Sequence, residues 1–317
     1  MALAAAVALV ATFAARYVPL AGAPVLAIVL GIALRAVMPL PERCRPGLAF
    51  SSRTLLQAAI VLSGLALSIG AVIRTGLGTL PVTLGSVAVA LLLAPLVGRA
   101  LGLRGAVRSL IGVGTAICGA SAIAAVASVI EPEETEIALA IATVFFYNIA
   151  AVLVFPPIGH ALQMTQAQFG LWAGSAINDT SSVVAAGYVY GQQAGAYATI
   201  VKLTRATLIL PIVAGIVALR ARSGAAKEIP WRHIVPWFIL WFLVAALASG
   251  AGIVRASWHG AIGVLATFLI ATALAAIGVN TELRRLLRAG PRPLALGFFL
   301  WVAVALSSLA IQRVTGL

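Results

Sequence analysis

One acidic residue of the chain lies where a charge is costly. Asp179 belongs to the string AINDTSSVVAAG (176–187), inside an apolar stretch, whereas the other acidic residues fall in loops or at the ends of apolar stretches. A carboxylate at membrane depth costs several kcal/mol unless it is paired or hydrated, so it marks a functional site by default. Its polar neighbours are Asn178, Thr180, Ser181 and Ser182. The sequence therefore predicts an ion- or substrate-binding site around Asp179.

A second string repeats the first. GTAICGASAIAA (114–125) aligns with GSAINDTSSVVAA (174–186), so that glycine, alanine, isoleucine and serine recur at an offset of 60 residues. Both copies place small and polar residues in mid-segment, which weakens a continuous helix. The alternative explanation is that small residues simply allow helices to pack closely in a membrane. If both segments are broken, the earlier copy adds Cys118, Gly119 and Ser121 to the predicted site.

Two basic residues lie in a third apolar segment. Lys202 and Arg205 are three residues apart and therefore share one helix face. We expect one of them to pair with Asp179 and the other to face a negatively charged substrate. The alternative is that both side chains extend to the membrane interface. Two cations and one carboxylate would leave the cavity net positive, which favours anions.

These residues belong to a chain with the composition of a helical membrane protein. It is 62% hydrophobic and only 9% charged, whereas soluble domains have about 25% charged residues. We expect one transmembrane transporter domain over residues 1–317, all-α and polytopic, with about 11 membrane segments. The expected segments are 1–15, 22–38, 54–72, 80–101, 109–130, 136–158, 168–189, 194–219, 234–250, 260–278 and 293–312.

Charge and composition also limit the partners and cofactors. The net charge of +13 comes from basic residues spread over short loops, so we expect no nucleic-acid partner. Cys44 and Cys118 are far apart and the histidines lack metal-ligand spacing, so neither a disulfide framework nor a metal site is expected. The chain has no GxxxxGK[ST] motif and no evident catalytic set. We therefore expect no cofactor and no enzyme.

Loop charges predict how the chain is oriented. Basic residues concentrate in four loops, near 43–53, 99–108, 220–232 and 284–292. By the positive-inside rule these loops and the N-terminus are cytoplasmic, and the C-terminus is outside. GLALSIGAVIRTG (64–76) also aligns with GVNTELRRLLRAG (278–290), on segments that run in opposite directions. Such inverted repeats are typical of secondary transporters.

Two arrangements of the repeated strings fit these charges. Either both are discontinuous helices that cross the membrane, or both are re-entrant hairpins that enter from opposite sides. The second arrangement moves only the acidic loop EPEET (131–135) to the cytoplasm. We favour the crossing helices. In either case the breaks, near 118–120 and 178–180, should meet close to the midplane and line a cavity, because unpaired backbone at that depth must be satisfied by protein or water.

Three motifs in order resemble one family. ICGASAI (117–123), FGLWAGSAINDTSSVVAAG (169–187) and KLTR (202–205) resemble the YeiH family, whose members are usually labelled sulfate exporters. The resemblance runs roughly from Gly31 to the C-terminus. It implies the cation:proton antiporter and anion transporter superfamily, and an inverted-repeat bundle with discontinuous central helices. The family usually has a histidine where this chain has Asn178, which would leave Asp179 as the only titratable acid of the site.

The residues and the resemblance together predict a secondary transporter of the bacterial cytoplasmic membrane. We expect its substrate to be a small anion, first of all sulfate or a related sulfur oxyanion, with transport coupled to H⁺ or Na⁺. The alternative is a cation:proton antiporter in which Asp179 binds the ion and Lys202 or Arg205 is a structural partner. The lipid bilayer is the other expected partner, and a homodimer is left open.

Overall fold

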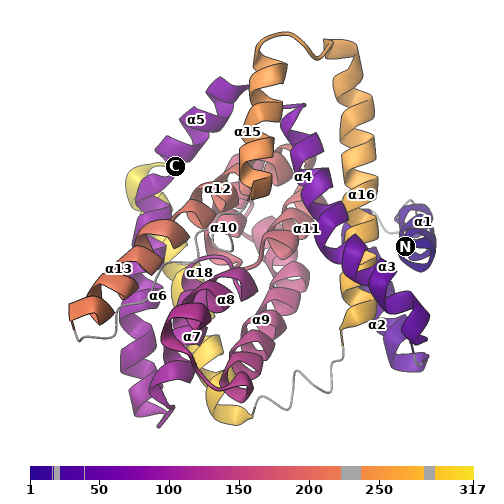
Figure 1. Cartoon of the computed structure of the whole chain (residues 1–317). Helices are drawn as coiled ribbons and strands as arrows, with labels where there is room; N and C mark the ends of the chain where they lie inside the picture. Colours follow the sequence, from indigo (N-terminus) through magenta and orange to yellow (C-terminus); the bar gives the residue numbers. More distant parts are fainter. Residues whose placement is uncertain (16, 18–21, 39, 223–236, 282–289) are drawn as a thin grey trace.

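The chain folds into a bundle of helices, and no strand occurs among the residues described. The structure is a computed structural model that describes the chain except residues 16, 18–21, 39, 223–236 and 282–289. Figure 1 shows the arrangement. The elements are α1 (Ala2–Ala14), α2 (Gly22–Val37), η1 (Glu42–Cys44), α3 (Arg45–Phe50), η2 (Ser51–Leu55), α4 (Leu56–Gly64), α5 (Ile69–Gly78), α6 (Leu80–Ala100), α7 (Gly105–Ala116), α8 (Ala120–Ile130), α9 (Glu134–Ala161), α10 (Gln166–Ala176), α11 (Thr180–Tyr190), α12 (Gln192–Thr207), α13 (Ile209–Arg222), α15 (Trp237–Gly250), η3 (Ala256–Trp258), α16 (His259–Asn280) and α18 (Pro291–Thr315).

The all-α membrane fold expected from composition is confirmed. In the described part of the chain, five helical stretches are long and apolar enough to cross a bilayer: α6, α9, α12 with the start of α13, α16 and α18. The shorter apolar helices α1, α2 and α15 match the expected segments 1–15, 22–38 and 234–250. The chain is thus a multi-pass membrane protein.

One expected span is bent. The expected membrane segment 54–72 is divided, because α4 ends at Gly64 and α5 begins at Ile69, with an angle of 106° between the two arms. The hydroxyl of Ser68 accepts a hydrogen bond from the Ala71 N–H at 3.2 Å and so caps α5. Apolar residues lie on both sides of the bend, so hydropathy alone could not reveal it.

The first repeated string, α7 and α8, is a re-entrant hairpin. Gly114 and Ile123 are nine residues apart, which in a straight helix would separate them by about 13 Å. A Cβ atom added to Gly114 would instead lie 2.9 Å from the Ile123 side chain. Arg104, just before α7, and Glu133, just after α8, are 3.6 Å apart. Both ends of the hairpin therefore lie at the same end of the molecule.

The second string, α10 and α11, is also a hairpin. At the start of α10, Gln166 Oε1 accepts hydrogen bonds from the N–H groups of Gln193 (2.9 Å) and Ala194 (3.1 Å), which follow the end of α11. The hydroxyl of Tyr190, the last residue of α11, donates to the carbonyl of Gly159 near the end of α9, at 3.3 Å. Both ends of this hairpin therefore lie where α9 ends.

The long helix α9 starts beside the first hairpin and ends beside the second, so the two hairpins enter from opposite ends. The expectation of crossing helices is therefore wrong, and the inverted re-entrant arrangement is the one observed. The acidic loop 131–135 lies at the same end as Arg104, as that arrangement requires. Local composition did not decide between the two because both need the same break. In the other repeat, 282–289 lies outside the described residues.

The helices form two groups, which we call the hairpin bundle (α6–α13 and α18) and the facing bundle (α1–α4, α15 and α16). In the facing bundle, α2 crosses α16 at backbone contact, since a Cβ atom on Gly278 would clash with the carbonyl oxygen of Ile28. In the hairpin bundle, α18 holds α10 through a 3.1 Å bond from Trp172 Nε1 to the Ala305 carbonyl. The bent helix α5 leaves the facing bundle and contacts both α15 and α12 (Figure 1).

Candidate functional site

The tips of the two hairpins meet. In the first, α7 ends at Ala116 and α8 begins at Ala120; in the second, α10 ends at Ala176 and α11 begins at Thr180. A Cβ atom on Gly119 would lie 3.7 Å from Asp179 Cβ. Gly119 has φ of +68°, a left-handed conformation that favours glycine. The predicted breaks near 118–120 and 178–180 are thus present and adjacent.

Asp179 caps the second inner helix. Its carboxylate oxygen Oδ2 accepts hydrogen bonds from the backbone N–H groups of Ser181 (2.9 Å) and Ser182 (3.3 Å), and from the Ser181 hydroxyl. These bonds satisfy donors that a helix start leaves unpaired, and the negative charge suits the positive end of the helix dipole. Asp179 is therefore stabilised by backbone and hydroxyl groups.

Asn148 of α9 holds the second tip in place. Its Oδ1 accepts hydrogen bonds from the backbone N–H groups of Asn178 (3.2 Å) and Asp179 (3.1 Å). These two N–H groups lie in the break between α10 and α11, where the helix cannot satisfy them. The Asn178 side chain turns into the protein, where Oδ1 has no hydrogen-bond partner among the described residues.

Lys202 and Arg205 lie behind the tips, and both are fully buried. Lys202 Nζ donates to the carbonyl of Ile117 at 2.6 Å and to that of Ile177 at 3.0 Å, so one ammonium group joins both breaks. Arg205 donates from Nε to the Ala116 carbonyl at 2.7 Å and from Nη2 to the Thr115 carbonyl at 3.1 Å. Lys202 therefore stabilises the carbonyl ends of both outer helices, α7 and α10, and Arg205 stabilises that of α7.

The predicted pairing of Asp179 with one of these cations is wrong. Among the described residues, Asp179 makes no ion pair within 4.0 Å. Lys202 Nζ and the Nε and Nη2 groups of Arg205 donate to backbone carbonyls instead. Neither cation lines the cavity described below; both lie behind the tips that form its floor. Snorkelling to the interface is excluded as well, since both side chains are fully buried.

A cavity of about 610 Å³ lies between the two bundles, directly over the tips. From the hairpin bundle it is lined by Ala120, Ser121, Ile141, Val144, Phe145, Asn148, Asp179, Thr180 and Ser181. From the facing bundle it is lined by Ser52, Arg53, Leu56, Gln57, Ile60, Trp237, Phe238, Ile277, Asn280 and Thr281. The floor is thus polar and formed by the starts of α8 and α11, whereas aliphatic and aromatic side chains form much of the wall.

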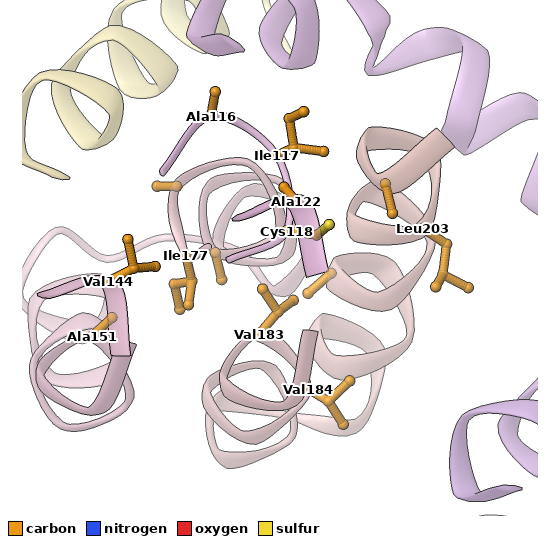
Figure 2. Packing of buried hydrophobic residues seen from close by; sticks show 14 of the residues in the cluster. Ala116, Ile117, Cys118, Ala122, Val144, Ala151, Ile177, Val183, Val184 and Leu203 are labelled. Carbon is orange, nitrogen blue, oxygen red and sulfur yellow. The ribbon is translucent and has the colours of Figure 1, made fainter. Parts of the chain in front are cut away.

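The ten residues predicted from sequence fall into three layers around this floor. Ser121, Asp179, Thr180 and Ser181 line the cavity. The tips beneath it are formed by Cys118, Gly119, Asn178 and Ser182. Lys202 and Arg205 are deepest. Figure 2 shows the apolar side chains gathered around the tips, from both hairpins, α9 and α12: Ile117, Cys118, Val144, Ile177, Val183 and Leu203.

Sequence reasoning missed several lining residues. Arg53 belongs to the basic loop near 43–53 and was not among the predicted site residues, yet it lines the cavity. Asn280 and Trp237 line it too, and neither was predicted from the sequence. These residues come from segments far from the repeated strings, and no local motif marks them. The bend and packing of the facing bundle bring them to the site.

The two inner helices differ in charge at the cavity. The N-cap of α11 is the carboxylate of Asp179, whereas the N-cap of α8 is Gly119, which has no side chain. Within the described part of the chain, the N–H groups of Ala120 and Ser121 at the start of α8 have no hydrogen-bond partner, and both residues are exposed to the cavity. A helix start with free N–H groups attracts anions.

Comparison with known proteins identifies the family. The profile of the family described as "Conserved hypothetical protein 698" matches residues 1–297. A UPF0324 membrane protein of Streptococcus pyogenes serotype M3 is 38% identical over 322 residues, which cover 98% of this chain and 95% of that protein. One from Streptococcus pneumoniae serotype 4 is 38% identical, with 95% and 92% covered. One from Fusobacterium nucleatum is 34% identical, with 95% and 93% covered.

No solved structure matches the chain. The family profile and the relatives extend over nearly all of it, including both hairpins, α12 and the cavity between the bundles. They agree with the resemblance seen in the motifs of both tips. The chain therefore belongs to the UPF0324 family of membrane proteins, which is the YeiH family.

Proposed function

We propose that the protein is a secondary transporter that moves a small oxyanion, sulfate or a related sulfur oxyanion, across the bacterial cytoplasmic membrane. The observation that supports this most is the floor of the cavity. There, two re-entrant tips from opposite ends meet, and one of them exposes unpaired N–H groups of a helix start. Broken helices around a mid-membrane site are typical of secondary transporters.

The charges around the tips support an anion. The carbonyl ends of α7 and α10, which would repel an anion, are bound by Lys202 and Arg205. The free helix start of α8 faces the cavity without an acidic cap. Asp179 contributes one negative charge, but two buried cations lie behind it. The tips therefore keep a net positive charge at a depth where the dielectric constant is low and charges act strongly.

The alternative is a cation:proton antiporter that binds its ion at Asp179. In its favour, Asp179 lines the cavity and is half-buried. Against it, Oδ2 already accepts three hydrogen bonds from the start of α11, and the same region exposes N–H donors, which repel cations. We therefore favour the anion, with coupling to H⁺ or Na⁺ and Asp179 as the group that would carry the coupling ion.

The loop charges support a cytoplasmic N-terminus, and the hairpins do not change this proposal. Arg104 and Arg292, from two of the four basic loops, line one shallow cleft with Glu133. Those two loops therefore share one end of the molecule, as the positive-inside argument requires. The cavity would then open toward the cytoplasm, because Arg53 of the loop 43–53 and Trp237, which follows the loop 220–232, line it.

The test is exchange in proteoliposomes. Purified protein in vesicles loaded with sulfate should take up labelled sulfate, and should not exchange sodium for protons. In Ala120→Pro, one N–H that faces the cavity is lost, while proline is tolerated at the first residue of a helix. This change should lower sulfate exchange about tenfold, since a bond to a charged group is worth about 1.5 kcal/mol or more.

Glu134→Pro is the matched control. It makes the same change at the first residue of α9, away from the cavity, and should leave exchange unchanged. Sodium–proton exchange without sulfate exchange would refute the anion and support the alternative.

A further inference from the structure

One cation of the cavity lies apart from the two tips. Arg53 lies in η2 (Ser51–Leu55), a π-helical turn between α3 and α4, and its side chain lines the cavity from the facing bundle. Single π-helical turns are rare and are frequent at functional sites. Among the described lining residues, Arg53 and Asp179 are the ionisable ones. Arg53 is thus the cationic side chain that this lining offers to a ligand.

The guanidinium of Arg53 is available for binding. Within the described residues it forms neither an ion pair within 4.0 Å nor a side-chain hydrogen bond. Arg45, eight residues earlier, is different, because it lies 3.8 Å from Glu42 at the surface. A guanidinium presents paired N–H donors that match two oxygen atoms of an oxyanion. Polar side chains surround Arg53 in the lining: Ser52, Gln57, Asn280 and Thr281.

Arg53 changes the total formal charge around the cavity. At the tips, Lys202 and Arg205 against Asp179 leave one positive charge, enough to neutralise a monoanion. Arg53 supplies a second positive charge from the opposite wall of the same cavity. A ligand held between the walls therefore meets the α8 start on one side and a guanidinium on the other.

We infer that Arg53 is a substrate-binding residue that selects for the second negative charge of an oxyanion held between the two bundles. This inference rests on the proposed anion transport, and it assigns to Arg53 the preference for a dianion over a monoanion. Because Arg53 belongs to the facing bundle and the tips to the hairpin bundle, a dianion joins the two bundles through its own oxygen atoms. A monoanion bound at the tips makes no charge-assisted bond to Arg53.

Sulfate and methanesulfonate test this directly, because they share a tetrahedral sulfur but differ in one charged oxygen, which is a methyl group in the second. Binding of each anion to purified protein should be measured by calorimetry at one ionic strength, for wild type, Arg53→Gln, Arg53→Lys and Arg43→Gln. Arg43 is exposed in η1, ten residues before Arg53, and does not line the cavity, so its variant controls for surface charge.

In Arg53→Gln, sulfate affinity should fall about tenfold or more, the loss expected for a bond between charged groups, whereas methanesulfonate affinity should change less than about threefold. Arg53→Lys should recover part of the sulfate affinity, and Arg43→Gln should match wild type. Equal losses for both anions, or no loss, would overturn the inference while wild-type binding upholds the proposed transport. Failure of the wild type to bind either anion would overturn both. A thermal melt of each variant identifies any loss that comes from misfolding.

Discussion

Gly119 and Asp179 are equivalent residues of the two hairpins, since each immediately precedes the inner helix of its hairpin. They stand 60 positions apart in the aligned strings, and their Cβ positions are 3.7 Å apart at the tips. Yet Asp179 caps its helix with a carboxylate, and Gly119 leaves its helix start open to the cavity. An inverted pair of hairpins therefore forms a site whose two halves carry different charges.

Asp179→Asn should fold and should remain as stable as wild type, within about 0.5 kcal/mol, because Asn caps helices as well as Asp. Asp179→Ala should lose about 1 kcal/mol with the cap. If Asp179 carries the coupling ion, the Asn variant should still exchange sulfate for sulfate but should no longer concentrate sulfate in response to an ion gradient. Thermal melts and both transport modes check this. A stable Asn variant without any exchange would mean that the carboxylate itself binds the substrate.

Gly119→Ala should destabilise the first tip by about 1–2 kcal/mol through its positive φ, not through crowding, since the added Cβ would meet only ordinary contacts at 3.6–3.7 Å. Gly215→Ala, in the exposed middle of α13 with open space around it, is the control and should be neutral or slightly stabilising. Chemical denaturation in detergent measures both. A loss at Gly215 equal to that at Gly119 would contradict the backbone explanation.

Lys202→Met should loosen both tips together. Removing the ammonium leaves the carbonyls of Ile117 and Ile177 without donors, which should cost on the order of 3 kcal/mol. Cys118, buried beside the first tip, reports the effect: in a background without Cys44, its thiol should react faster with a maleimide in Lys202→Met than in wild type. Arg74→Gln, on the exposed face of α5, should leave the labelling rate unchanged. Unchanged labelling in Lys202→Met would show that the tips hold without the lysine.

A disulfide between α5 and α12 should stop transport if α5 moves with the facing bundle relative to the hairpin bundle. A Cβ atom on Gly76 of α5 would lie 3.0 Å from Thr204 Oγ1 of α12, so cysteines at these two positions are within reach of a disulfide. In a background without Cys44 and Cys118, oxidation should abolish sulfate exchange and reduction should restore it. Cysteines at Ile69 and Gly250, which lie close together on α5 and α15, form the control pair and should leave exchange intact. Full activity of the oxidised Gly76–Thr204 pair would exclude sliding of α5 along α12.

The hairpin arrangement predicts the side of the acidic loop. A cysteine at Thr135, in a background without Cys44 and Cys118, should resist an impermeant thiol reagent in intact cells, because this loop lies at the end of the basic loops. A cysteine at Gln163, at the other end of α9, should be labelled. The reverse pattern would mean that the whole chain is inserted in the opposite orientation.

The local features of the site could be predicted from sequence, and its long-range contacts could not. Small and polar residues at the two tips broke both helices where the aligned strings indicated, because a helix break is a local property of the backbone. The partners of Lys202 could not be foreseen, since it binds carbonyls rather than a side chain of opposite charge. Backbone acceptors exist at every residue and carry no signature in the sequence.

The sequence also could not predict whether each broken segment crosses the membrane or turns back as a hairpin. A break near Gly119 fits a crossing helix and a re-entrant one alike, and the loop charges agree with both. What decides is packing: Gly114 against Ile123, and Gln166 against the start of α12. Packing also explains why Arg53 lines the cavity, because the facing bundle places the π-helical turn that carries Arg53 opposite the tips.

The two hydrogen bonds of Lys202 restrict how the centre of the molecule can rearrange. If one tip withdrew while the other stayed, the fully buried ammonium would lose one of its two acceptors, and the carbonyl of the withdrawn tip would lose its donor. Separate gating of the two hairpins is therefore costly. The two tips and α12 should instead travel as one rigid block, so that access to the cavity changes at its boundary with the facing bundle.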